Sequence, residues 1–191
     1  MGRRERFTAG SAGVAFLVGL VKVADGVNEW IGRIVAWVTL GTVLVCAAVV
    51  VLRYAFAWGS ICLQEAYVWQ HAVVFMVGAG YTFAHRGHVR VDIFYARFSN
   101  RARAWVDLFG TLAFLLPWLA ILVWFGWPFI ALSWSLREGS AQAGGCEGYY
   151  LLKSTVFVFA AVVGVQGLAL AARSILVLMG REEFAPEPAG H

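Results

Sequence analysis

His71 is the ionisable side chain whose position most strongly suggests chemistry. It lies beside Gln70 inside Ala66–Ala84, a stretch without a formally charged residue when His71 is neutral, and an ionisable group inside a membrane helix is a candidate functional group. An imidazole that hydrogen-bonds between helices is the structural alternative. Haem ligation would usually need a second axial ligand on a facing helix. His85 and His88 lie at the border after this stretch, and the other apolar stretches contain no histidine, so a haem site with two histidine ligands is not expected.

Charged residues mark both borders of this stretch. Glu65 precedes it, and a basic run from His85 to Arg90 follows it, with Asp92 close behind. Glu65 is either a proton-coupling carboxylate or, at the rim, a helix cap or a contact for another chain. The basic run is interpreted as ordinary border charge, a binding site for lipid headgroups, an internal pairing or a docking site for a partner.

Patterns that carry enzyme chemistry are missing from the sequence. It has no glycine-rich phosphate loop, no nucleophile-and-base pattern and no spaced set of metal ligands. Cys46 lies in an apolar stretch, and the sequence leaves a disulfide between Cys62 and Cys146 open. We therefore expect no enzyme activity, no cofactor and no metal.

Apolar helices must position these residues. Hydrophobic residues make up 61% of the 191-residue chain and charged residues 14%, whereas about a quarter of a soluble domain is charged. Because a helix needs about 20 apolar residues to cross a bilayer, the sequence predicts an all-α integral membrane protein with four transmembrane helices. The expected crossings are at about 34–52, 66–84, 108–134 and 154–172.

The two ends of the chain flank this four-helix membrane domain, which is expected to cover residues 34–180. In residues 1–33, an apolar line that includes Phe16 and Trp30 lies opposite Lys22 and Asp25. This pattern predicts an uncleaved amphipathic helix in the membrane interface, with a plain extension of the first crossing as the alternative. The acidic, proline-bearing tail at 181–191 is predicted to be disordered.

Lysine and arginine are distributed unevenly along the chain. Twelve of the fifteen fall on one side of the predicted membrane, and only Arg53, Arg137 and Lys153 fall on the other. By the positive-inside rule, both termini are expected in the cytoplasm, and Glu65 and Glu138 on the opposite side. The net charge of +4 does not indicate nucleic-acid binding, because the basic residues sit at helix borders.

The polar and small residues of the second crossing fall on one stripe. Its members recur at helical spacing and are Gln64, His71, Gly78, Thr82 and His85. Such a stripe is expected to contact protein rather than lipid. In the longer third region, Pro117 and Pro128 are the expected places for a kink, and its tryptophans are expected to anchor the helix near the interface.

Short motifs along the chain now form a recognisable pattern. They are Gln64-Glu65, Trp69, Phe75, Gly78-Ala79, Arg86, His88, Val91-Asp92, Arg103-Ala104-Trp105, Ser133-Trp134, Glu138-Gly139-Ser140, Gly144-Gly145 and Leu152-Lys153. With them, residues 30–180 resemble the small membrane subunit of a tripartite ATP-independent periplasmic (TRAP) transporter, the DctQ family. The end of the second crossing, from Arg86 to Asp92, is the most specific part of the resemblance.

The resemblance implies a role that one chain cannot perform alone. In this family a large DctM-type permease subunit holds the substrate and sodium sites, and a soluble periplasmic DctP-type protein delivers the solute. The small subunit braces the static scaffold of the large one. It follows that the chain is expected in the bacterial inner membrane, supporting sodium-coupled uptake of a small organic solute such as a carboxylate.

Nine residues are therefore candidates for contacts with partners. They are Gln64, Glu65, His71, Gly78, Thr82, His85, Arg86, Asp92 and Glu138. Glu65 and Glu138 are expected near the docking site of the delivery protein, and Arg86 and Asp92 at the cytoplasmic end, with membrane lipids around the helices. Two alternatives stay open. A small proton-coupled exporter would need a deep carboxylate, which the predicted crossings lack, and a haem- or quinone-linked anchor would use His71.

Overall fold

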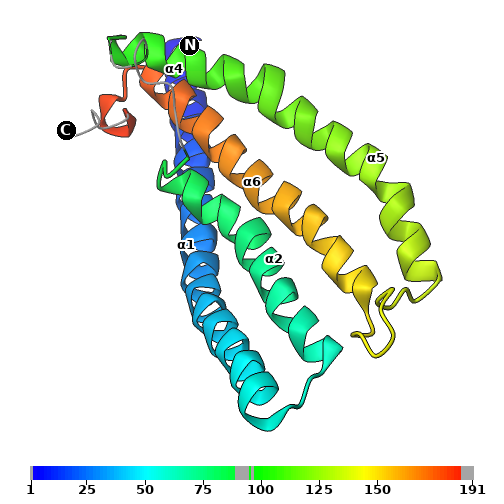
Figure 1. The fold of residues 1–191 in the computed structure, drawn as a ribbon. Coiled ribbons are helices and arrows are strands. Elements are labelled where there is room, and N and C mark those ends of the chain that lie inside the picture. Colours follow the sequence, from blue (N-terminus) through cyan, green and yellow to red (C-terminus); the bar gives the residue numbers. More distant parts are fainter. Residues whose placement is uncertain (1, 89–94, 96, 186–191) are drawn as a thin grey trace.

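The computed structural model of the chain describes residues 2–88, 95 and 97–185, and only the backbone of residues 2–11. All regular structure in these residues is helical. Two helical hairpins make up the fold, α1 with α2 and α5 with α6 (Figure 1). A disulfide between Cys62 and Cys146 joins the two hairpin turns, so both turns lie at one end of the molecule, here called the disulfide end.

Helix α1, Gly2–Phe56, is much longer than one membrane crossing. Its 55 residues extend over about 82 Å at 1.5 Å per residue. The helix has no break at residue 33, where an interfacial helix and the first crossing were predicted to meet. Its buried positions Val21, Ala24, Asn28 and Val35 run past this point at helical spacing, and their packing keeps the helix continuous.

Helices α2, Ile61–Ala84, and α6, Tyr149–Leu178, both begin earlier than the crossings predicted for them. Ser60 starts α2, because its side-chain oxygen accepts a hydrogen bond from the backbone N–H of Leu63 at 3.3 Å. Gly148, with φ +89°, takes the left-handed conformation that turns the chain into α6.

The third apolar region forms one rod made of three parts. These are α4, Asn100–Gly110, the π-helical segment η1, Thr111–Leu115, and α5, Leu116–Ser135. The helix widens directly before Pro117, where the N–H of Leu116 bonds to the carbonyl of Thr111. Since proline has no N–H to continue the regular ladder, the irregularity falls where the sequence cannot support an α-helical bond.

Three helical segments among the described residues are long and apolar enough to cross a membrane. They are Ala12–Phe56, Asn100–Ser135 and Tyr149–Leu178. Helix α2 has 24 residues, but Glu65, Gln70 and His71 make it less apolar. The protein is therefore an all-helical, multi-pass membrane protein.

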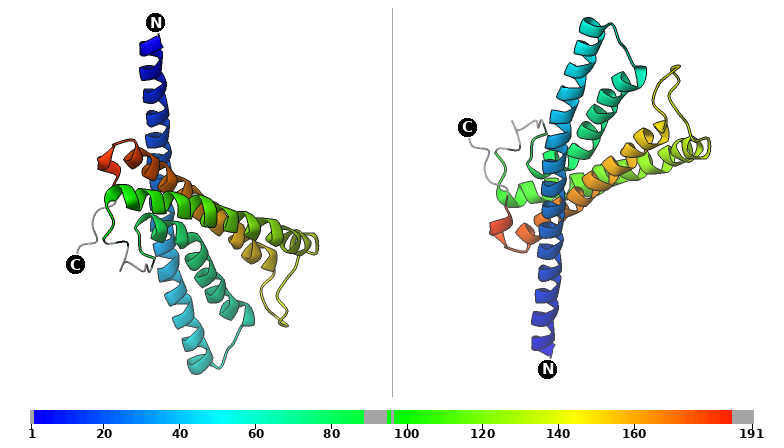
Figure 2. Two further views of the ribbon diagram at one scale, coloured as in Figure 1. Left: turned by 90° about the horizontal axis from the view of Figure 1, so that it is seen from above. Right: turned by 90° about the horizontal axis from the view of Figure 1, so that it is seen from below.

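Helix α6 lies at the centre of the fold and contacts α1, α2, α4 and α5. One buried cluster joins it to α1 through Val21, Ala24, Ala169 and Ala172. A second cluster joins it to α2 and α5, and contains Ala79, Leu119, Ala160, Val162 and Val163. Alanines let the helices approach closely, and Figure 2 shows α1 running across the α5–α6 hairpin at a steep angle.

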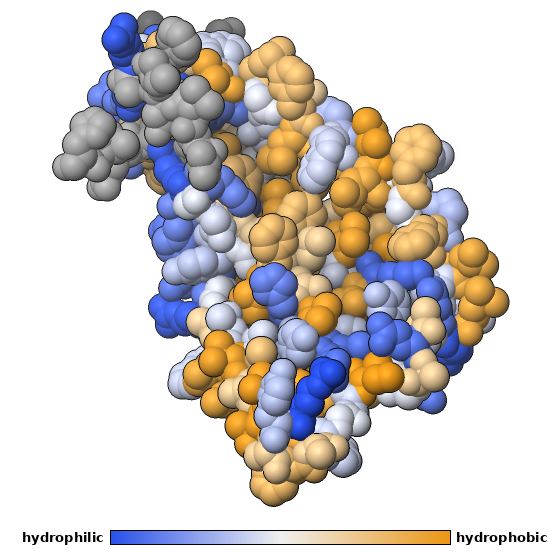
Figure 3. Space-filling view, viewed as in Figure 1, coloured by the Kyte–Doolittle hydropathy of each residue, from blue (hydrophilic) through white to orange (hydrophobic). Residues whose placement is uncertain are grey.

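Apolar side chains cover much of the surface, as Figure 3 shows over α5 and α6. The exposed tryptophans of α5 include Trp118, Trp124 and Trp127. A surface of this kind suits a helix that faces lipid.

The start of the tail is ordered, unlike the prediction of disorder from residue 181. Gly180, with φ +91°, ends α6, and the N–H of Arg181 returns to the carbonyl of Leu176 at 3.0 Å. Glu182–Phe184 then form a 3-10 helix, η2, which packs on α6. Local hydrogen bonds and this packing order the segment despite its polar composition, and residues 186–191 lie outside the described part.

Candidate functional site

At the disulfide end, Glu65 holds the turn between α5 and α6. Ser140 Oγ donates a hydrogen bond to Glu65 Oε1, and the backbone N–H of Cys146 donates to Glu65 Oε2 at 2.7 Å. Cys62, one turn earlier in α2, forms the disulfide with Cys146. The carboxylate that was predicted at the rim therefore binds within its own chain and fixes α2 to the turn.

Glu138 has partners of its own beside the same turn. Ser133 Oγ and Lys153 Nζ both donate hydrogen bonds to Glu138 Oε2, each at 2.6 Å. The bond from Lys153, followed by that from Ser133, holds the pKa of Glu138 below its ordinary value. Lys153 Nζ also lies 4.1 Å from the centre of the Phe129 ring, which stabilises the cation. Glu138 thus closes the α5–α6 hairpin, and Glu147 is the neighbouring exposed carboxylate.

Where α1 crosses α6, four polar side chains form a connected network, here called the α1–α6 polar cluster. Its members are Asp25 and Asn28 of α1 and Gln166 and Arg173 of α6. Asn28 Nδ2 donates to Gln166 Oε1 at 2.8 Å, and Gln166 Nε2 donates to Asp25 Oδ1 at 3.2 Å. Arg173 pairs with Asp25. Asn28 is 0% and Gln166 1% exposed, so the network joins the helices from inside the bundle.

Helix α2 fits against this cluster through glycine. A Cβ atom at Gly80 would lie 2.2 Å from Asn28 Oδ1 and 2.9 Å from Val162 Cβ, so a side chain there would collide with both α1 and α6. Closer to the end of α2, Gly32 of α1 gives room to the ring of Tyr81, which would lie 2.1 Å from an added Cβ. These two glycines bring three helices together around Asn28.

The predicted polar stripe of α2 divides into different environments. Gly78 faces α1, because an added Cβ would lie 3.4 Å from Val35 Cγ1, and its carbonyl accepts a hydrogen bond from Thr82 Oγ1 at 3.1 Å. Gln64 lines a small hollow beside Arg53 at the α1–α2 turn. His71, by contrast, is exposed.

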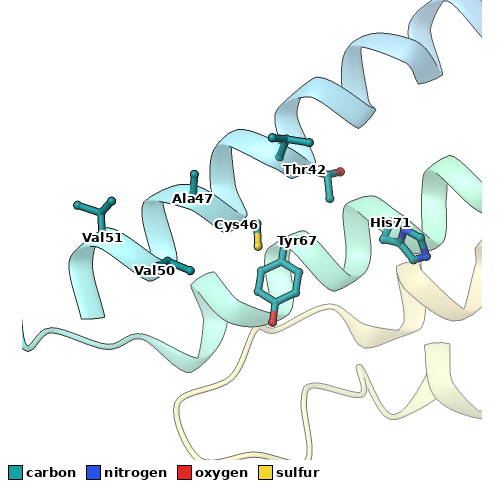
Figure 4. A pocket seen from close by; sticks show the side chains of 8 residues that line it. Thr42, Cys46, Ala47, Val50, Val51, Tyr67 and His71 are labelled. Atoms are coloured by element: carbon teal, nitrogen blue, oxygen red, sulfur yellow. The ribbon is translucent and has the colours of Figure 1, made fainter. Parts of the chain in front are cut away.

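A groove of about 640 Å³ surrounds His71 on the outer side of the α1–α2 hairpin. Tyr67 and His71 extend into it from α2, and α1 supplies the other wall, as Figure 4 shows. The α1 residues are Thr42, Val43, Cys46, Ala47, Val50 and Val51. Cys46 is exposed with a free thiol.

At the other end of α2, His85 lies beside α1. Its Nε2 is 3.4 Å from Glu29 Oε2, and Arg86 follows with φ +54°. The backbone N–H of Gly87 then donates to the carbonyl of Thr82 at 2.8 Å and closes the end of the helix. Asp92, the remaining predicted contact residue, lies outside the described residues.

Asn28 and its partnership with Gln166 were missed by the sequence reasoning. The available signal was the spacing of Asp25 and Asn28 on one side of α1 and of Gln166 and Arg173 on one side of α6. Two such polar pairs on apolar helices are expected to meet, since each offers hydrogen-bond partners to the other.

No group of three or more His, Cys, Asp and Glu side chains that could hold a metal ion is found within the described ranges. The polar groups instead join helices at the disulfide end and at the α1–α6 crossing, and leave His71 exposed between α1 and α2.

Comparison with known families agrees with this arrangement. The family model described as tripartite ATP-independent periplasmic transporters, DctQ component, matches residues 41–181. No curated protein and no solved structure gives a significant match. The match covers all of α2, α4, α5 and α6 and the second part of α1, so the chain belongs to the DctQ family and is a small membrane subunit of a TRAP transporter.

Proposed function

We propose that this chain is a static brace for a large DctM-type permease subunit, which takes up a small organic solute, such as a carboxylate, together with sodium. The observation that carries the proposal is the fastening of the two hairpins at separate points. The disulfide and Glu65 join them at one end, and the α1–α6 polar cluster joins them at the crossing. A bundle held in this way resists bending, as a support for a moving partner requires.

The proposed arrangement in the membrane has four crossings. Helix α2 has 24 residues, or about 36 Å, which exceeds a hydrocarbon core of about 30 Å. It packs along α1 after a short turn between Phe56 and Ile61. Because α1 reaches the disulfide end through apolar residues, α2 must return through the same layer.

The proposed orientation puts the disulfide end in the periplasm and both termini in the cytoplasm. Disulfides form and persist in oxidising compartments, which favours the periplasm for Cys62 and Cys146. The uneven distribution of lysine and arginine supports the same orientation. In this orientation the protein lies in the inner membrane of a bacterium.

The first part of α1 is proposed to pass through the cytoplasmic headgroup layer of the membrane. Val23, Trp30, Ile34 and Trp37 form an exposed apolar line along it, while Asp25 turns to α6. Exposed tryptophans beside charged residues suit the headgroup layer. The helix then continues into the first crossing without a break.

The predicted contact residues take different parts in this proposal. His71 faces the large subunit, and His85 and Arg86 lie at the cytoplasmic end. Glu65 and Glu138 shape the surface offered to a DctP-type delivery protein, because they hold the turn whose exposed tip is residues 141–144.

Purification of the complex tests the brace. The tagged chain, extracted in mild detergent from membranes that contain the large subunit, is expected to retain that subunit in a constant ratio. Cys146→Ser, which opens the disulfide, is expected to lower the retained amount, while Ile121→Val, a conservative change on the exposed face of α5, serves as the control. A chain that never retains a permease subunit under conditions that keep its disulfide intact would contradict the proposal.

A further inference from the structure

The exposed membrane faces of this chain differ in chemistry. Between Leu116 and Leu132, α5 has only apolar and aromatic side chains, and Trp124 is 78% exposed. Lipid tails suit the apolar part of such a surface. The α1–α2 hairpin instead exposes His71 in the groove beside Cys46 and Tyr67. Apart from the indole N–H groups of its tryptophans, this part of α5 has no polar side chain, whereas the groove contains an imidazole, a thiol and a phenol hydroxyl.

His71 lies at a depth where lipid cannot satisfy it. It is five residues from Ala66, the first residue of the predicted crossing, or about 8 Å along the axis, and so lies inside a hydrocarbon core of about 30 Å. No hydrogen bond to its imidazole is found among the described residues. Its neighbours on the same side, Val68 and Phe75, are exposed, the latter by 70%. The described part of the fold therefore supplies no hydrogen-bond partner for the imidazole.

Small side chains line the α1 wall of the groove. Thr42, Cys46 and Ala47 are small, and Thr42 Oγ1 already bonds to the carbonyl of Val38 at 3.0 Å. Small residues let another helix backbone approach closely. The lining of α1 from Thr42 to Val51 covers about 14 Å, or two to three turns of such a helix.

We propose that a transmembrane helix of the large permease subunit occupies this groove and bonds to His71 through a side chain or a freed backbone carbonyl. The inference rests on the proposed function and adds the face by which the brace binds its partner. A lipid chain would fill the groove without bonding to the imidazole, so a protein helix is the occupant that accounts for both the small side chains of the α1 wall and His71. The aromatic face of α5 then contacts lipid.

The free thiol of Cys46 provides a direct probe. The full chain in membranes, with and without the large subunit, is treated with N-ethylmaleimide, and the modified fraction is measured by mass spectrometry. We expect the complex to slow the labelling of Cys46 at least tenfold. The matched control, Ile121→Cys on the exposed face of α5 in a chain that keeps Cys46, is expected to label at position 121 equally in both samples. An intact Cys62–Cys146 disulfide reports that the chain is folded.

Different outcomes separate this inference from the proposed function. If the complex purifies intact but Cys46 reacts at the same rate as in the lone chain, the large subunit does not occupy the groove. The proposed bracing function is then unaffected. If no complex forms, the proposed function fails. Cross-linking of two Cys46 thiols by a short bis-maleimide would assign the groove to a second copy and overturn the inference.

A change of His71 gives a second, independent measurement. His71→Leu is expected to reduce the large subunit retained on purification several-fold, and His71→Gln, which keeps a hydrogen-bonding group, to restore much of it. The disulfide is unaffected in both variants, because His71 contributes to no internal bond among the described residues. Equal retention by the Leu variant and the parent chain would contradict the role given to the imidazole.

Discussion

The replacement of Gln166 by leucine tests whether the α1–α6 polar cluster joins the two hairpins. Gln166 makes two hydrogen bonds to α1, to Asn28 at 2.8 Å and to Asp25 at 3.2 Å. Leucine has a similar volume, so the change removes the bonds with little loss of packing. Interhelical hydrogen bonds in membranes contribute about 0.6 kcal/mol each on average and up to about 1.7, and the loss of two predicts a destabilisation of about 1–3 kcal/mol.

The assay is reversible unfolding in mixed micelles, followed by tryptophan fluorescence. A double-mutant cycle with Asn28→Leu isolates the bond between the two amides, and a coupling of about 0.5–1.5 kcal/mol is expected. Val165→Leu, an exposed position on the same helix, serves as the control and is expected to change stability by less than about 0.5 kcal/mol. If Gln166→Leu unfolds at the same denaturant concentration as the parent, or if the two amide changes simply add, the cluster does not join the helices.

Three further changes address the other contacts that fix the bundle. Gly80→Leu is expected to destabilise the chain by about 1–3 kcal/mol or more, because the new side chain meets Asn28 Oδ1; a lower midpoint in the same assay checks it, and an unchanged midpoint would show that α2 is not held there. Cys146→Ser removes a cross-link that closes 84 residues and is expected to lower stability by about 2–5 kcal/mol, whereas a reducing agent should then have no further effect. Because the pKa of Glu138 is lowered in the folded chain, its contribution to the stability of the folded state is present at neutral pH and is lost as pH falls through the lowered pKa. Glu138→Gln should therefore flatten the acidic part of the plot of stability against pH. An unchanged plot would mean that the bond to Lys153 does not contribute to stability.

Much of the fold was predictable because its helices are apolar and long. The third and fourth apolar regions were recognised as helices by hydropathy, since Leu116–Leu132 and Val156–Val165 contain no charge, and both lie within long helices. The start of α6 was missed, because Gly148 begins the helix before the apolar run, and turn geometry is weakly encoded in hydropathy. The sequence left open whether residues 1–33 form an interfacial helix or extend the first crossing, and buried packing on both sides of Arg33 makes α1 one continuous helix.

The site was less predictable, because it depends on which helices meet. The sequence favoured a helix cap or a contact with another chain for Glu65, whereas its partners are Ser140 and Cys146 of its own chain. The sequence alone could not choose between a buried and an exposed His71, since its stripe also contains Gly78, which faces α1. Both answers depend on contacts between residues far apart in the chain.

Solute uptake by a reconstituted system tests the central claim most directly. Proteoliposomes with the large subunit and the delivery protein, with or without this chain, are given a sodium gradient and a labelled organic acid. The brace predicts uptake only when the small subunit is present, and none by the small subunit alone. Equal uptake without this chain, or transport by this chain in the absence of its partners, would contradict it.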